Sequence, residues 1–190
     1  MTSFSPASRS TTRFLPRAVS SSLMRVGLVS DTHGLLRPEV LAFLRGSDHI
    51  VHGGDVCDVA VLDALRSVAP VTAVRGNNDR GAWAAGLRES ELFRLGGILV
   101  YVIHDLAEID LEPSAAGVRV VVSGHSHRPA IEQRDGVLYV NPGSAGPRRF
   151  SLPISAAELT VDAGRVAARI VEFASSPARA PEDASARPRR

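Results

Sequence analysis

The 190-residue sequence has no lysine, one cysteine and few aromatic residues, and these scarcities limit what the protein can be. Because Cys57 has no second cysteine to pair with, a fold held by internal disulfides is excluded, and a reducing cytoplasmic location is expected. No apolar run approaches the roughly 18 residues that a membrane-spanning helix needs, so no membrane partner is expected. The hydrophobic fraction of 44% is nevertheless that of a globular protein, and the length suits one domain.

Positive charge is also scarce in the middle of the chain, although the whole sequence has a formal net charge of +2. Residues 1–23 and 174–190 hold seven of the 22 arginines but only two of the 20 acids. Residues 24–173 therefore keep 15 arginines and 18 acids, a net charge of −3. A groove for nucleic acid needs the opposite distribution, so nucleic acid is not an expected partner.

The two ends of the chain differ in composition from the segment between them. Residues 1–23 are rich in Ser, Thr and Arg, as organellar transit peptides are. Since Met24 directly precedes the first strand pattern, they are interpreted equally as a disordered extension or as a start codon placed too early. Residues 174–190 are rich in Pro, Ala and Arg and are expected to be a disordered tail. One domain is therefore expected over residues 24–173.

Strand and helix patterns alternate in the first half of this domain. Apolar runs predict strands at residues 25–30, 49–52 and 70–76. Between them, one helix is expected from Pro38 to Gly46 and another over residues 58–68. A βαβαβ order of this kind predicts a parallel sheet with helices packed on it.

The second half is richer in strands. Further strands are expected at residues 98–104 and 118–125, in a hairpin that turns at Asp135-Gly136, and in a last hairpin over 155–161 and 165–172. Two mixed sheets packed face to face, with helices outside, would use all of these elements. The expected fold is thus an α/β sandwich of four layers, in the order α-β-β-α.

Side chains that can bind metals follow the predicted strands, at or just beyond the point where each strand ends. They are Asp31, Asp55, Asn77, His104 and His125. In open α/β sheets, ligands bind at this edge. Residues far apart in the sequence are therefore expected to gather in one cluster.

Short motifs carry these residues, and their value lies in their order. They are Asp31-Thr32-His33, Gly54-Asp55, Gly76-Asn77-Asn78-Asp79, Gly124-His125-Ser126-His127 and Asn141–Ser144. An Asp-x-His alone is common, whereas chance gives Gly-His-x-His in well under ~1% of chains of this length. The occurrence of all of them in this order after successive strands makes chance a poor explanation.

This ordered set resembles the calcineurin-like metallophosphoesterase superfamily, and within it the small single-domain YfcE-type phosphodiesterases. The resemblance covers residues 24–173 and implies the four-layer sandwich with a two-metal site at one edge of the sheets. It also implies that Asp55 bridges two metals. By the family pattern, one metal would be held by Asp31, His33 and His127, and the other by Asn77, His104 and His125.

The chemistry of a phosphoesterase requires such a set. Two divalent ions about 3.5–4 Å apart can clamp a phosphoryl group and hold a hydroxide for in-line attack. Imidazole, carboxylate and amide donors without a thiolate suit two divalent transition-metal ions, with Mn favoured and Ni, Fe, Co or Zn as alternatives. The expected activity is a metal-dependent phosphodiesterase acting on a small phosphate ester. The alternative is a non-catalytic protein-binding scaffold of the same fold, like the retromer subunit.

Two positions depart from the family pattern. Asn78 stands where much of the superfamily has a histidine that assists the leaving group, so it is a candidate catalytic and substrate-binding residue. An amide can donate a hydrogen bond to a phosphoryl oxygen, but it cannot give up a proton at neutral pH. Asp105 follows His104 where the family usually has glycine.

Other polar residues are assigned with less direct support from the motifs. Arg80 is a candidate contact for substrate phosphate, as are Arg148 and Arg149. His49 and His52 are outside the family's ligand positions and are expected to be structural, at most beside the ligands.

Overall fold

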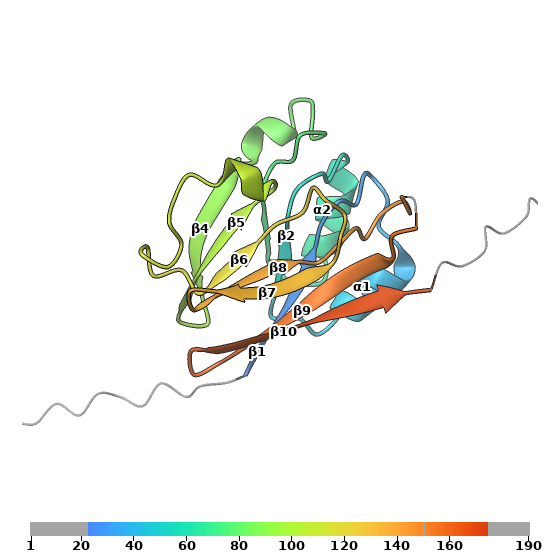
Figure 1. Ribbon diagram of the computed structural model, residues 1–190. Coiled ribbons are helices and arrows are strands. Elements are labelled where there is room, and N and C mark those ends of the chain that lie inside the picture. Colours follow the sequence, from blue (N-terminus) through green and yellow to red (C-terminus); the bar gives the residue numbers. More distant parts are fainter. Residues whose placement is uncertain (1–22, 150, 175–190) are drawn as a thin grey trace, which may run out of the picture.

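A computed structural model describes residues 23–149 and 151–174 of the chain (Figure 1). In this part, two five-stranded sheets pack face to face, in the orders β10-β9-β1-β2-β3 and β4-β5-β6-β8-β7. Both sheets are mixed, so the predicted α/β sandwich of two mixed sheets is confirmed. The predictions for the two chain ends lie outside the described residues, apart from Leu23 and Ala174. No helix within the described ranges is long and apolar enough to cross a membrane.

The first sheet is built on the predicted βαβαβ unit. Its parallel strands are β1 (Met24–Val29), β2 (His49–His52) and β3 (Val71–Ala73). The helices between them are α1 (Pro38–Leu44) and α2 (Val59–Arg66), which pack on one face of this sheet (Figure 1). The antiparallel strands β9 (Ile154–Asp162) and β10 (Arg165–Phe173) complete it.

The second sheet contains one strand that the sequence patterns did not predict. Its members are β4 (Ser90–Leu95), β5 (Ile98–Ile103), β6 (Val120–Val122), β7 (Ala130–Arg134) and β8 (Val137–Asn141). The unpredicted strand is β4, which lies at the edge of the sheet and pairs with β5. Its sequence SELFRL has no apolar run, because an edge strand keeps several polar side chains in solvent.

The main core lies between the sheets, where valines of β1, β2, β5, β6 and β8 meet. On β1, Val26 and Leu28 point into this core, whereas Gly27 between them faces α1. A Cβ at Gly27 would lie 2.3 Å from Leu44 Cδ2, so only glycine lets α1 pack this closely. The alternation of residues along β1 therefore determines both which face packs against the second sheet and which face packs against α1.

The outer face of the second sheet is covered by the segment between β5 and β6. This segment includes the short 3-10 helix η2 (Leu106–Glu108) and places Leu106, Ile109 and Leu111 against Tyr101 and other residues of the sheet. The helical layer on this side is thus a single short turn with loops.

Candidate metal centre

All seven predicted metal ligands lie on loops that follow the carboxyl ends of parallel strands, as expected. Asp31 and His33 follow β1, Asp55 follows β2, Asn77 follows β3, His104 follows β5, and His125 and His127 follow β6. The sandwich brings these loops together at one edge. The prediction that residues distant in the sequence form one cluster agrees with this arrangement.

The first group of donors consists of Asp31, His33 and His127, whose donor atoms all lie within 4.8 Å of one another. His127 Nε2 lies 3.3 Å from Asp31 Oδ1 and 3.4 Å from His33 Nε2. The two imidazole rings stack, with centroids 5.2 Å apart. One ion could therefore reach all three side chains.

The second group of donors surrounds the side-chain oxygen of Asn77. Asn77 Oδ1 lies 3.1 Å from His104 Nε2 and 3.2 Å from His125 Nδ1. Asp55 stands between the two groups, with Oδ2 3.5 Å from His104 Nε2 and 3.8 Å from His33 Nε2. This is where a carboxylate shared by two ions would have to be.

The proton on His104 shows that this second group needs a cation. His104 Nδ1 lies 2.7 Å from the carbonyl oxygen of Gly53, which can only accept, so Nδ1 carries a proton. Nε2 then faces Asn77 Oδ1 and Asp55 Oδ2, which are both acceptors. Although burial lowers the pKa of His104, its hydrogen bonds to Asp55 and Gly53 outweigh this and raise it. Either a second proton or a metal ion must occupy this position.

The burial of Asp31 indicates that the first group of donors needs a cation as well. It is fully buried, and neither carboxylate oxygen receives a hydrogen bond from the described residues. Burial raises the pKa of Asp31 to about 6, and it also lowers the pKa of the adjacent His127 to about 4. A buried carboxylate without donors is unfavourable unless a cation accompanies it. The donor set of this edge therefore fits bound divalent ions.

Backbone conformation also distinguishes this edge. Five of the seven residues have positive φ angles between 46° and 64°, namely Asp31, His33, Asp55, His125 and His127. The left-handed region is uncommon for residues other than glycine, although Asp, Asn and His tolerate it best. Such strain costs about 1–3 kcal/mol per residue and tends to gather at functional sites.

The glycines of the motifs allow the loops to approach one another. A Cβ at Gly76 would lie 2.2 Å from Asp55 Oδ1, and one at Gly124 would lie 2.0 Å from Ser30 Oγ and 2.7 Å from Asp31 Oδ2. Any larger residue would push a donor away. The glycines that precede Asn77 and His125 thus serve the geometry of the site.

Asn78 contacts Asp55 through both its backbone and its side chain. Burial raises the pKa of Asp55, but hydrogen bonds from His104 and Asn78 outweigh it and hold the pKa well below its usual range. Asp55 is therefore ionised at neutral pH, as a metal ligand must be. The side chain of Asn78, predicted to contact substrate, is directed at this carboxylate.

Asp79 is a site residue that the sequence analysis missed. Its carboxylate is buried and accepts hydrogen bonds from the backbone N–H groups of Cys57 at 2.6 Å and Gly76 at 2.8 Å. It therefore ties the loop that carries Asp55 to the loop that carries Asn77. The sequence feature that could have identified Asp79 is its place at the end of the motif Gly76–Asp79.

His52 lies beside the predicted metal ligands and contacts the loops that carry them, which is the structural position expected from the sequence. Gly54 N donates to its Nδ1 at 3.2 Å, so Nε2 carries the proton and donates to Thr32 Oγ1 at 3.0 Å. The ring is fully buried, and burial lowers its pKa to about 3, so it stays neutral. It joins the loop of Asp31 to that of Asp55.

The remaining candidates lie at the rim of the site. Arg149 Nη2 lies 3.4 Å from His33 Nε2, and Asp105 Oδ2 lies 3.6 Å from His125 Nε2. Arg80 is exposed, and its contact with substrate stays a prediction. Asn141 shapes the wall of the site, because its side chain donates to the carbonyl oxygen of Gly124 at 2.7 Å.

Comparison with known proteins identifies the family. A model of the calcineurin-like phosphoesterase superfamily domain matches residues 24–164, and the chain belongs to this superfamily. A probable metallophosphoesterase from Methanocaldococcus jannaschii is 35% identical over 134 residues, which are 64% of this chain and 68% of the relative. Another from Methanothermobacter thermautotrophicus is 32% identical over 160 residues, or 78% and 92% of the two chains. A phosphodiesterase from M. jannaschii is 25% identical over 139 residues, or 63% and 83%.

Solved structures share the fold. The Vps29 protein of Entamoeba histolytica in complex with Zn²⁺ superposes with a TM-score of 0.61 at 22% identity, covering 80% of this chain and all of that one. At this identity the likeness concerns the fold alone. The metallophosphoesterase class therefore rests on the family match and on the curated relatives.

Proposed function

We propose that this chain is a phosphodiesterase that hydrolyses a small phosphate ester with the help of two divalent transition-metal ions. The observation that carries the proposal is the position of Asp55 between two groups of donors, 3.8 Å from His33 and 3.5 Å from His104. Two ions bound there would supply a hydroxide nucleophile and stabilise the negative charge that develops on the phosphoryl oxygens. The relative from M. jannaschii that is named a phosphodiesterase supports the choice of a diester.

Each of the two ions would be held by a different set of side chains. One ion would be held by Asp31, His33 and His127, the other by Asn77, His104 and His125, with Asp55 shared between them. With its Nδ1 proton held by the carbonyl oxygen of Gly53, His104 would have its Nε2 lone pair available to the second ion, as is common for metal-bound histidines. Imidazole, carboxylate and amide donors suit Mn²⁺ and its transition-metal neighbours, and we propose Mn²⁺ as the native ion.

Arg149 could hold the substrate phosphate from the rim. Its guanidinium already reaches His33, and it is exposed, so it can turn toward an anion bound beside that histidine. The alternative of a non-catalytic scaffold is not favoured, because the sequence keeps all seven residues of the predicted donor set and two curated relatives are named probable metallophosphoesterases.

Metal content and turnover of an Asp55→Asn variant test the proposal. Asparagine tolerates the left-handed backbone of position 55, but it cannot serve as a bridging carboxylate. The unmodified chain should bind about two equivalents of Mn²⁺ and hydrolyse bis(p-nitrophenyl) phosphate. The variant should lose metal and at least ~10²-fold in kcat/KM. The control is Asp63→Asn, a change of an exposed carboxylate on α2.

The outcomes separate two parts of the proposal. Full metal content and turnover in Asp55→Asn would refute the bridging role. Failure of the Mn²⁺-loaded unmodified chain to hydrolyse any phosphodiester would refute the activity itself.

A further inference from the structure

A cleft of about 200 Å³ opens beside Asn77, His104 and His125, which form one of its walls. The rest of its lining is contributed by Arg75, Gly76, Glu89, Asp105 and Glu108. If the phosphoryl group of a substrate lies at these three donors, a group esterified to it can extend into the cleft. The assignment of that group rests on the proposed function.

The cleft has an excess of negative charge. Beyond the donor wall, its lining holds three carboxylates and one guanidinium, so these side chains carry a net charge of −2. The single guanidinium, Arg75, is engaged by Glu89. Among the ion pairs of the described residues, neither Asp105 nor Glu108 has an arginine partner. These two carboxylates are therefore available to a cationic group in the cleft.

Asp105 is held in place, so its charge has a fixed direction. Its Oδ1 accepts a hydrogen bond from Ala107 N at 2.9 Å, which caps η2, and its Oδ2 lies 3.6 Å from His125 Nε2. The charge thus stands directly beside the donor wall.

The kind of cation follows from what the lining lacks. Its eight residues include no Phe, Tyr or Trp. Nucleobases and quaternary ammonium groups are bound mainly on the faces of these three side chains, which the lining lacks. A primary ammonium, in contrast, donates strong hydrogen bonds to carboxylates. A second phosphate group would be repelled by the same carboxylates.

We propose that this cleft binds the primary amine of a short aminoalkyl group, so that phosphodiesters carrying one aminoalkyl group are the preferred substrate class, with the other ester group as the leaving group. The phosphate would lie at the metal centre, and the ammonium would lie between Asp105 and Glu108. The volume of about 200 Å³ limits the group to a few carbons.

Binding of two probes of equal size tests this assignment. 2-Aminoethyl phosphate and n-propyl phosphate differ only by an ammonium in place of a methyl group. Titration calorimetry with the Mn²⁺-loaded full chain should give about three- to tenfold tighter binding of the amine, the range of two partly exposed ion pairs together. The preference should shrink at high salt, because the carboxylates are open to solvent.

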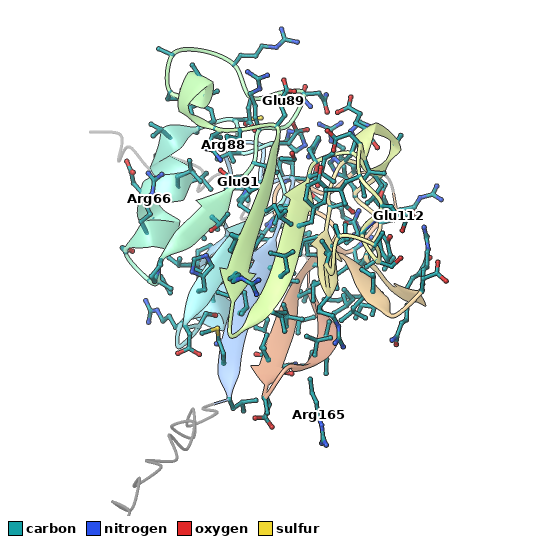
Figure 2. The ribbon with its side chains drawn as sticks, turned by 90° about the vertical axis from the view of Figure 1, so that its left-hand side faces the viewer. Arg66, Arg88, Glu89, Glu91, Glu112 and Arg165 are labelled. Carbon is teal, nitrogen blue, oxygen red and sulfur yellow. The ribbon has the colours of Figure 1, made fainter. Side chains whose placement is uncertain are left out.

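Two matched variants locate the preference. Glu108→Gln should weaken binding of 2-aminoethyl phosphate about two- to fivefold and affect n-propyl phosphate much less. Glu112→Gln should alter neither, because this exposed carboxylate lies away from Glu89 (Figure 2) and is not among the residues that line the cleft. Equal binding of the two probes, or a preference unchanged by Glu108→Gln, would overturn the inference.

Hydrolysis of bis(p-nitrophenyl) phosphate, measured on the same samples, separates this inference from the proposed function. Hydrolysis without a preference for the amine overturns only the assignment of the cleft. A preference for the amine without any hydrolysis supports the cleft and overturns the proposed activity.

Discussion

Asn78 holds the carboxylate of Asp55 at both oxygens: its backbone N–H donates to Oδ1 at 2.8 Å, and its side-chain amide donates to Oδ2 at 2.6 Å. Asn78 is thus a positioning residue for the proposed bridging ligand. Its amide fixes the orientation of the carboxylate between His33 and His104. The structure therefore gives Asn78 a role that the sequence did not indicate.

Removal of this amide should weaken metal binding. In Asn78→Ala the backbone hydrogen bond to Asp55 Oδ1 remains, and only the side-chain bond to Oδ2 is lost. Loss of one such outer contact typically lowers metal affinity about 10- to 100-fold. Competition with a chelator for Mn²⁺ would measure the change, and Gln133→Ala, on the exposed part of β7, serves as the control. Unchanged affinity in Asn78→Ala would remove the positioning role.

Asp31 should make the metal-free protein less stable at neutral pH. Burial raises its pKa to about 6 from 3.8, so the folded state binds this proton more tightly than the unfolded chain. Its contribution to the free energy of unfolding is therefore greatest below about pH 4 and is lost as pH rises to about 6. Asp31→Asn removes this charge, and its amide can donate to His127 Nε2, 3.3 Å away from Oδ1.

The metal-free Asp31→Asn variant should thus exceed the unmodified protein in stability at pH 7, by up to about 3 kcal/mol. The same variant should bind metal poorly. Denaturant unfolding in the presence of a chelator, at several pH values, measures the difference in unfolding free energy between the two proteins. The titration of His127 and His52 occurs in both proteins and largely cancels in this difference. A difference that is equal at pH 4 and pH 7 would contradict the raised pKa of Asp31.

Asp79 should contribute strongly to stability, because its two backbone hydrogen bonds join separate loops. In Asp79→Asn one acceptor becomes a donor that faces a backbone N–H, of Cys57 or of Gly76. The buried mismatch should lower the free energy of unfolding by about 2–4 kcal/mol. Asp63→Asn, which alters an exposed ion pair on α2, should change it by less than about 0.5 kcal/mol. Equal effects of the two changes would show that Asp79 does not join the loops.

The sequence predicted that the candidate donor side chains would lie close together, because each stands where a parallel strand ends, and such strands share an edge. Because β1, β2 and β5 are buried, they appear in the sequence as apolar runs. The ends of these runs located Asp31, Asp55 and His104 at the carboxyl ends of the strands. Contacts that depend on how two loops meet were not predictable. No periodic pattern in the sequence indicates the hydrogen bonds of Asp79 or the direction of the Asn78 side chain.

Proton supply to the leaving group should limit which esters this site hydrolyses. Asn78 has no proton to give, and its amide is engaged by Asp55. General acid catalysis is typically worth about 10²–10⁴-fold, and its value grows as the leaving group becomes more basic. The unmodified protein should therefore hydrolyse esters of acidic phenols readily and esters of alkyl alcohols poorly. A plot of log kcat/KM against the pKa of the leaving group should be steep.

Asn78→His should make that plot shallower, mainly because it accelerates esters with basic leaving groups. An imidazole at this position can carry a proton, whereas the amide cannot. Since the change also removes the amide bond to Asp55, metal content must be measured on the same samples and kept saturated. Asn78→Gln keeps an amide without adding an acid, so it should leave the plot steep. A shallow plot for the unmodified protein would mean that another group already supplies the proton, and Asn78 would then keep only its hydrogen bonds to Asp55.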